Sequence, residues 1–149
     1  MPEQVGAAIV HGDYRLGNMI VRKGDVKAVL DWELCTLGHP LADVGYLFNN
    51  WLSPEEAEHE PNRDIFPTAV GGYPARDELG AIYTERTGRD LTHIDYYRAF
   101  SHWRMAAIGQ GVYKRYQEGA MGAEKQMDLQ GKFESVAHRA RQALSLLQK

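Results

Sequence analysis

Hydrophobic and polar residues follow two different patterns along the chain, and the change falls near Pro40. Before it, residues 7–10 form a short apolar run that ends at a polar turn, which predicts a buried strand or stretch of chain leading into a loop. Between residues 19 and 30, two β-prone runs flank the pair Gly24-Asp25, which is typical of a β-hairpin. The first part of the chain is therefore expected to consist of short strands and loops.

Beyond Pro40 the apolar residues recur at helical spacing. The expected helices cover residues 41–52, a short segment from Ser53-Pro54, residues 75–87, about 92–118 and about 123–147. The fold class is thus predicted as α+β and mainly α, with one hairpin followed by four or five helices.

The predicted helix ends rest on capping residues. Ser53, followed by Pro54 and by Glu56 three residues on, has the pattern of a capping box, and the run Thr92 to Asp95 resembles another. Gly88 and Gly119 are expected to end the two helices that precede them. The three prolines and the Gly71-Gly72 pair between residues 60 and 74 predict a long loop.

Composition narrows the class of protein. The chain has 149 residues, of which 44% are hydrophobic, and this is the balance of one soluble globular domain. Acidic side chains outnumber basic ones 20 to 17, so nothing indicates nucleic-acid binding. The charge is uneven, with 13 acidic and 4 basic side chains in residues 31–95 but 4 and 9 in residues 96–149, and solvated helix faces are the simplest explanation.

Cysteine content and hydropathy indicate a cytoplasmic protein. Cys35 is the single cysteine and has no intrachain partner for a disulfide. No apolar run approaches the roughly 18 residues that would span a membrane, and no secretory signal is recognised after Met1. We therefore expect no membrane partner.

Candidate chemistry is concentrated on either side of the predicted hairpin. If Gly24 and Asp25 form a two-residue turn, paired residues sum to 49, which places Asn18 directly opposite Asp31 with Cβ atoms about 5 Å apart. A turn one residue longer would still leave Asn18 and Asp31 neighbours. A second carboxylate, that of Asp13, lies five residues before Asn18 on the loop that enters the hairpin.

These oxygen donors suit magnesium. Mg²⁺ is typically held by one or two carboxylates together with substrate phosphates, so Asn18 and Asp31 are the predicted metal and cofactor ligands. Asp13 then remains free to orient an acceptor hydroxyl and take its proton. The spacing His-x-Asp-x₄-Asn from His11 to Asn18 is the one that protein kinases use for this division of roles.

The same segments resemble a known family. His11-Gly12-Asp13 to Asn18, the hairpin, Leu30 to Glu33, and Gly38 to Tyr46 closely resemble the aminoglycoside phosphotransferase family, whose fold is like that of protein kinases. The resemblance implies ATP- and Mg²⁺-dependent phosphorylation of an alcohol group on a small molecule. It also implies Asp13 as the catalytic base, Asn18 and Asp31 as the Mg²⁺ ligands, and a structural Asp43 that braces the catalytic loop.

Two departures from the antibiotic-modifying kinases bear on the substrate. Arg15-Leu16 stands where those enzymes often carry His-Pro, so antibiotic resistance is not implied. The Asp31-Trp32-Glu33 form looks more like members linked to acyl-CoA dehydrogenases, which makes a hydroxyacyl compound a candidate acceptor.

A kinase-like fold also has an N-terminal lobe with a Gly-rich loop, and only ten residues precede His11. We therefore expect a single partial domain over residues 1–149, with the catalytic loop, hairpin and metal motif in 9–34, a helical subdomain in 35–149 and the nucleotide-binding lobe absent. Another chain could then complete the site. Gly109 and Gly111 lie in a helical pattern, so close helix packing explains them better than a phosphate loop.

Several alternatives remain open at this stage. His11 is expected to be structural and to hydrogen-bond the loop, whereas Glu33 could contact metal, substrate or a backbone donor. His11, His39 and Cys35 lack the close paired spacing of a zinc site. The alternative function is a catalytically silent kinase-lobe remnant that binds a partner through the helical surface exposed where the missing lobe should dock.

Overall fold

The computed structural model describes residues 2–3, 6–60, 66–120 and 128–148. The chain divides into two compact units, unit 1 over Met1–Arg98 and unit 2 over Ala99–Lys149, and the division falls within a long helix. Unit 1 holds every residue singled out for chemistry above.

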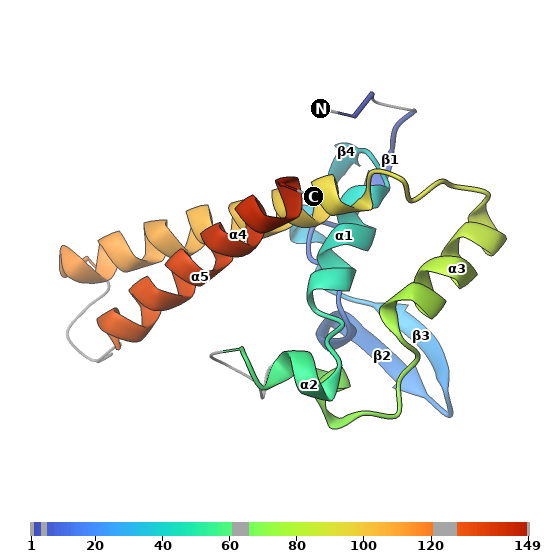
Figure 1. The fold of residues 1–149 in the computed structure, drawn as a ribbon, viewed down its shortest axis with the longest axis horizontal. Coiled ribbons are helices and arrows are strands. Elements are labelled where there is room, and N and C mark those ends of the chain that lie inside the picture. The colour runs from blue at the N-terminus through green and yellow to red at the C-terminus, as the bar shows by residue number, and fades with distance from the viewer. Residues whose placement is uncertain (1, 4–5, 61–65, 121–127, 149) are drawn as a thin grey trace. The chain divides into compact units, whose positions relative to one another are not determined.

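The secondary structure is mainly helical (Figure 1). In chain order the elements are β1 Ala8–Val10, the 3-10 helix η1 Leu16–Asn18, β2 Met19–Arg22, β3 Asp25–Val29, η2 Trp32–Leu34, β4 Thr36–Gly38, α1 Leu41–Asn49, α2 Pro54–Ala57, η4 Pro67–Val70, α3 Arg76–Thr87, α4 Ile94–Gln117 and α5 Leu129–Leu147. Five α-helices and a small hairpin in the described residues confirm the predicted fold class. Over the same residues, no helix has the length and apolar character to cross a membrane.

The predicted hairpin forms from β2 and β3, but its register is not the predicted one. The turn is Lys23-Gly24, whose φ values of 53° and 81° are both positive, as a type I′ turn requires, and Asp25 already belongs to β3. A bulge at Lys27 then shifts the pairing, so that Met19 lies opposite Val29. The backbone N–H of Leu30 donates to the carbonyl of Asn18, at 2.8 Å, so the expectation that Asn18 lies directly opposite Asp31 is wrong by one residue.

The predicted apolar strand at residues 7–10 is β1, and its partner is a strand that the sequence did not reveal. β1 pairs antiparallel with β4, and Ile9 lies opposite Leu37. Both side chains are largely exposed, at 71% and 75% of their surface. This second small sheet brings the residues before the catalytic loop next to those that follow η2.

The helix predictions hold, with corrections at the ends. The Ser53 box is confirmed in both directions, because Ser53 Oγ accepts from the N–H of Glu56 and the Glu56 carboxylate accepts from the N–H of Ser53. Gly88 ends α3 in the left-handed conformation, as predicted.

The capping box predicted at Thr92 is wrong, because the Thr92 hydroxyl donates to Asp90 and α4 begins at Ile94. Within the predicted loop of residues 60–74, η4 is an unpredicted 3-10 helix, and residues 61–65 lie outside the described part of the chain.

Two apolar clusters form the core of unit 1. Leu41, Val44 and Phe48 on one face of α1 pack with Tyr97 from the first turns of α4. Leu52, Ala57, Phe66 and Ala69 form the second cluster around α2 and η4. α1 is therefore the helix on which the remainder of unit 1 is assembled.

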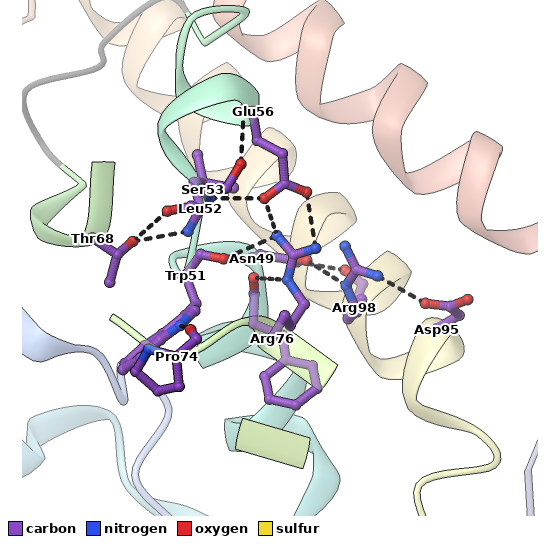
Figure 2. Close-up of polar contacts among 11 residues, drawn as sticks. Asn49, Trp51, Leu52, Ser53, Glu56, Thr68, Pro74, Arg76, Asp95 and Arg98 are labelled. Atoms are coloured by element: carbon purple, nitrogen blue, oxygen red, sulfur yellow. Dashed lines mark hydrogen bonds and ion pairs between the residues drawn. The ribbon is translucent and has the colours of Figure 1, made fainter. Parts of the chain in front are cut away.

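A partly buried arginine links these clusters through hydrogen bonds to main-chain carbonyl groups (Figure 2). Arg76 at the start of α3 donates to the carbonyls of Phe48 and Trp51, at 3.0 and 2.9 Å, and bidentately to Glu56, at 2.9 and 2.8 Å. Glu56 also completes the cap of α2. One guanidinium thus holds the end of α1, the start of α2 and the start of α3 together.

Replacing Gly45 with alanine is expected to destabilise unit 1. A Cβ on Gly45 would lie 2.7 Å from the carbonyl carbon of Tyr97 and 2.9 Å from the amide nitrogen of Arg98, and backbone atoms cannot move away cheaply. Overpacking of this kind costs about 1–3 kcal/mol, which exceeds the gain of up to about 1 kcal/mol in helix propensity. Chemical denaturation measures the change in free energy of unfolding.

The matched control for that prediction is Gly111→Ala. Gly111 also lies inside a helix, but a Cβ there would meet no atom within 4 Å. We expect this variant to be slightly more stable than the parent, by about 0.5–1 kcal/mol. Equal effects from Gly45→Ala and Gly111→Ala would contradict the close contact between α1 and α4.

Unit 2 is a helical hairpin of the rest of α4 and α5, which run side by side (Figure 1). A Cβ on Gly109 would lie 2.9 Å from Cγ2 of Val136, so this glycine permits close approach of the two helices. Close packing was the role expected for it. The predicted start of α5 at residue 123 lies outside the described residues.

Candidate functional site

The loop from His11 to Asp13 is held by side chains that bind its backbone. Asp43, in the first turn of α1, accepts hydrogen bonds from the N–H groups of His11 and Gly12, at 2.7 and 2.9 Å. The N–H of Asp13 donates to Nδ1 of His11, at 3.2 Å. Three consecutive backbone donors are thus satisfied, which fixes the path of the loop before its functional side chain.

Gly12 is the residue that this path requires. Its φ of 87° lies in the left-handed region, and a Cβ there would lie 2.8 Å from the carbonyl oxygen of Leu34. The loop therefore passes directly over η2, the short helix that follows Asp31.

His11 joins the loop to the hairpin. Its side chain is almost fully buried, with 1% exposed, and Nε2 lies 2.7 Å from the carbonyl oxygen of Leu30. Since Nδ1 accepts from the N–H of Asp13, Nε2 carries the proton and donates to Leu30, which assigns the neutral tautomer. The Trp32 ring packs on the imidazole with centroids 4.6 Å apart. These contacts give His11 a structural place between loop and hairpin.

The Asp13 carboxylate is partly buried and well supplied with donors. Nδ2 of Asn18 donates to Oδ2 at 2.8 Å, and Nε of Arg15 lies 3.5 Å from the same oxygen. Burial by itself would raise the pKa of Asp13, but hydrogen bonds from Tyr46 and Asn18 and the nearby charge of Arg15 outweigh it and hold the pKa below its usual range. The carboxylate is therefore ionised at neutral pH and held in a defined orientation.

Asn18 is buried, and its amide orientation follows from two hydrogen bonds. Nδ2 donates both to the carbonyl oxygen and to Oδ2 of Asp13, each at 2.8 Å. Both amide hydrogens are thereby used, so Oδ1 is directed away from Asp13. An amide oxygen fixed in this way can serve as a ligand for a cation.

Asp31 occupies a backbone conformation that is uncommon for aspartate. Its φ of 69° and ψ of 50° are left-handed, and its carboxylate does not cap η2, at whose N-terminus it stands. Strained backbone of this kind, costing of order 1 kcal/mol, is frequent at functional sites. Because Leu30 pairs with Asn18, Asp31 is the next residue beyond that pair, still close along the ribbon.

Glu33, the remaining candidate residue, makes fewer contacts than those above. Glu33 lies exposed on η2 and makes no hydrogen bond or ion pair with the residues that the structure describes. Within that same part of the chain, no three His, Cys, Asp or Glu side chains converge on a point where they could hold a metal ion. A cation at this site would accordingly have at most two such side chains as ligands, together with the Asn18 amide oxygen and oxygens of a bound ligand.

Sequence reasoning overlooked two side chains that contact Asp13. Arg15 lies beside its carboxylate, and Tyr46 on α1 hydrogen-bonds to it. The signal for Arg15 is its position two residues after Asp13. The signal for Tyr46 is its spacing of three from Asp43, which puts both on one face of α1.

A cavity of about 420 Å³ lies beside the loop within unit 1. Apolar side chains from β1, α1 and α3 supply most of its lining, including Ile9, Val44, Leu47 and Leu79, and Tyr14 and Arg86 add polar groups. Tyr14 directly follows Asp13, so the cavity adjoins the candidate site.

Unit 1 is expected to lose stability as the pH falls. The folded protein holds the pKa of His39 below its usual value through burial and the charges of Arg89 and His93, and Glu56, despite burial, is kept low by Arg76 and the cap of α2. Because the pKa of Asp13 is lowered as well, the unfolded chain binds more protons than the folded one as the pH falls. The free energy of unfolding is therefore highest above about pH 6.5. It decreases in steps as the pH falls, first as His39 is protonated and then as the carboxylates are protonated.

Urea denaturation from pH 7.5 to pH 4 measures this dependence. The midpoint should fall steadily, and the first part of the decrease should be missing in His39→Gln. A stability maximum near pH 5 would contradict the assignment of these three groups.

Comparison with known proteins adds an independent line of information. Residues 1–79 match the phosphotransferase enzyme family. The crystal structure of a Ralstonia eutropha protein assigned as an aminoglycoside phosphotransferase superposes with a TM-score of 0.74 at 35% identity, over 95% of this chain and 43% of that one. The predicted kinase-like fold is thereby confirmed.

Curated relatives are much longer proteins. Acyl-CoA dehydrogenase family member 11 of Gallus gallus is 36% identical over 128 residues, covering 83% of this chain and 16% of the relative. Acyl-CoA dehydrogenase family member 10 of Mus musculus is 42% identical over 119 residues, covering 77% and 11%. The chain thus spans about a sixth or less of these relatives, and the expected likeness to members linked to acyl-CoA dehydrogenases is confirmed.

Proposed function

Since the chain belongs to the phosphotransferase enzyme family, we propose that its site transfers the γ-phosphoryl group of ATP to an alcohol group of a small molecule in an Mg²⁺-dependent reaction. The observation that carries the proposal is the pair Asp13 and Asn18. One hydrogen-bonded unit keeps a carboxylate ionised and at the same time fixes the Asn18 amide through its nitrogen, which leaves the amide oxygen available to a cation.

Asp13 is the proposed base. Its ionised carboxylate accepts a hydrogen bond from the acceptor hydroxyl and takes the proton as the oxygen–phosphorus bond forms and the bond to the ADP leaving oxygen breaks. A lowered pKa makes Asp13 a weak base, so its main contribution is to orient the hydroxyl.

Asn18 and Asp31 are the proposed magnesium ligands. An amide oxygen and a carboxylate are hard donors of the kind that Mg²⁺ prefers, and they leave coordination positions for phosphate oxygens and water. The ion would neutralise charge on the transferred phosphoryl group. The fixed amide of Asn18 and the uncapped, left-handed Asp31 support this assignment.

The proposed acceptor is a hydroxyacyl compound. The apolar cavity beside Tyr14 supports an acceptor with an extended apolar part. The curated relatives are named as acyl-CoA dehydrogenases, so an acyl compound is a substrate class consistent with their names.

The second candidate is a binding module without catalysis. The cross-strand pair Ile9 and Leu37 presents exposed apolar surface on the β1–β4 sheet, which favours contact with another lobe or chain. The two candidates make opposite predictions for nucleotide binding.

Calorimetry with ATP and Mg²⁺ separates them. The first candidate requires Mg²⁺-dependent ATP binding that Asp31→Asn abolishes and that Asp25→Asn leaves unchanged, because Asp25 lies next to the hairpin turn and forms a surface ion pair with Lys27. Absence of ATP binding by the parent chain would favour the binding module.

A further inference from the structure

Another cavity of unit 1 lies where α2, η4 and the start of α3 meet. Its volume is about 480 Å³, which is within the range of small-molecule sites. Two aromatic rings, those of Trp51 and Tyr73, line it together with the charged side chains of Glu56, Arg76 and Asp77. None of its lining residues belongs to the catalytic loop or the hairpin, so the proposed function leaves this cavity without a role.

The rings of Trp51 and Tyr73 form an aromatic corner in the wall of the cavity. They are nearly perpendicular, at 82°, and their centroids are 5.5 Å apart. The indole is held in place, because its Nε1 donates to the carbonyl of Pro74 at 2.9 Å (Figure 2). The Tyr73 side chain remains 45% exposed. Two ring faces at a right angle can contact the same group when it lies in the corner.

The space next to the aromatic corner is open. Gly71 and Gly72 line the cavity directly before Tyr73, and neither has a side chain to fill it. Both have a φ of 82°, which lies in the left-handed region that side chains disfavour. A Cβ on Gly72 would meet no atom of the described residues within 4 Å. The glycine pair therefore leaves room for a ligand beside the two rings.

The charges around the cavity favour a cation. The guanidinium of Arg76 is neutralised by its bidentate bond to Glu56, and Arg98 is paired with Asp95 at 3.0 Å. Asp77 is exposed in the first turn of α3 and forms no hydrogen bond or ion pair with the residues that the structure describes. The faces of aromatic rings are also electronegative. The lining thus offers an unpaired carboxylate and two negative ring faces.

We propose that this cavity binds a small molecule through an ammonium group, which lies against the faces of Trp51 and Tyr73 and is paired with the carboxylate of Asp77. Aromatic rings, tryptophan above all, attract cations in this way, and quaternary ammonium groups are recognised by such rings. An anion would be repelled by Asp77, and a neutral apolar ligand would gain nothing from it. The volume leaves space for the part of the ligand that carries the ammonium group.

The test is an NMR titration of the chain with choline, at constant ionic strength and without ATP or Mg²⁺. The Trp51 indole N–H lies in the aromatic corner, so its ¹H–¹⁵N resonance reports binding there, and Trp51→Phe identifies it among the three tryptophans. We expect saturable shifts with choline and with tetramethylammonium. The neutral isostere 3,3-dimethylbutan-1-ol should bind about tenfold more weakly, because it lacks the charge.

Tyr73 is the best position for a substitution, because it is exposed and the hydrogen bond from Trp51 to Pro74 does not involve it. Tyr73→Leu should weaken choline binding about two- to thirtyfold, whereas Tyr73→Phe keeps the ring face and should bind like the parent. The circular dichroism spectrum of Tyr73→Leu should match that of the parent, which excludes unfolding as the cause.

The charge is tested on α3. Asp77→Asn should weaken choline binding about two- to fivefold, the effect of a surface ion pair. Glu85→Gln is the matched control, because it removes an exposed carboxylate of the same helix that does not line the cavity, and its affinity should equal that of the parent.

The proposal is overturned if choline gives no saturable shift of the Trp51 resonance in the parent chain. Equal binding of the neutral isostere, or parent-like affinity in Tyr73→Leu, would contradict it as well. The titration requires neither nucleotide nor turnover, so its result does not depend on whether Asp13 and Asn18 carry out phosphoryl transfer. Failure of the proposed function and failure of this proposal therefore give different results.

Discussion

Asp13→Ala is expected to lower kcat by about 10²–10⁴-fold, the range typical for loss of a positioned general base. The substitution removes the carboxylate on which Asn18, Arg15 and Tyr46 converge, so the acceptor hydroxyl loses both its orientation and its proton acceptor. Asp13 is not a proposed metal ligand, and we therefore expect nucleotide affinity to change little. Steady-state kinetics and calorimetry on the same preparation separate the two effects.

The control for this prediction is Asp25→Ala. Asp25 is also an aspartate of the hairpin, the first residue of β3, but it is exposed and forms an ion pair with Lys27 at the surface. Its turnover should match that of the parent. Turnover by Asp13→Ala within a factor of two of the parent would remove Asp13 from the mechanism. A large loss of ATP affinity in Asp13→Ala would instead indicate that the carboxylate helps to bind the metal.

The candidate site illustrates how far the sequence can be interpreted. The motif from His11 to Asn18 and the hairpin were predictable, because turn chemistry and β-prone runs are local signals. The register of the hairpin could not be predicted, because it depends on which two residues adopt positive φ and on the bulge at Lys27. Both Lys23-Gly24 and Gly24-Asp25 are plausible turn pairs, so the local sequence does not decide between them.

The contacts that orient Asp13 were beyond local reasoning. Tyr46 is 33 residues from Asp13 in the sequence and reaches it only when α1 packs against the loop. β4 was missed for a similar reason, since three residues carry almost no periodicity and the strand exists through its pairing with β1. Caps such as Ser53 and Gly88 were predictable because the signal and the structure lie within four residues.

Those long-range contacts also explain why one arginine should dominate the stability of unit 1. Arg76→Ala is expected to lower the free energy of unfolding by about 3 kcal/mol, because it leaves two main-chain carbonyls and a half-exposed carboxylate without their charged donor. The carbonyls belong to Phe48 and Trp51, and the carboxylate to Glu56. Figure 2 shows Arg76 between Trp51 and Glu56. Thermal unfolding followed by circular dichroism should show a midpoint lower by about 6–12 °C.

The geometry of the contact, and not its charge alone, sets the size of this effect. Arg76→Lys keeps the charge but cannot reproduce the bidentate bond to Glu56 and the two bonds to carbonyls, so its loss should approach that of alanine. Arg86→Ala is the control, because Arg86 is exposed in the last turn of the same helix and should cost less than about 1 kcal/mol. If Arg76→Ala and Arg86→Ala lowered the midpoint equally, the guanidinium would not be what joins α1, α2 and α3.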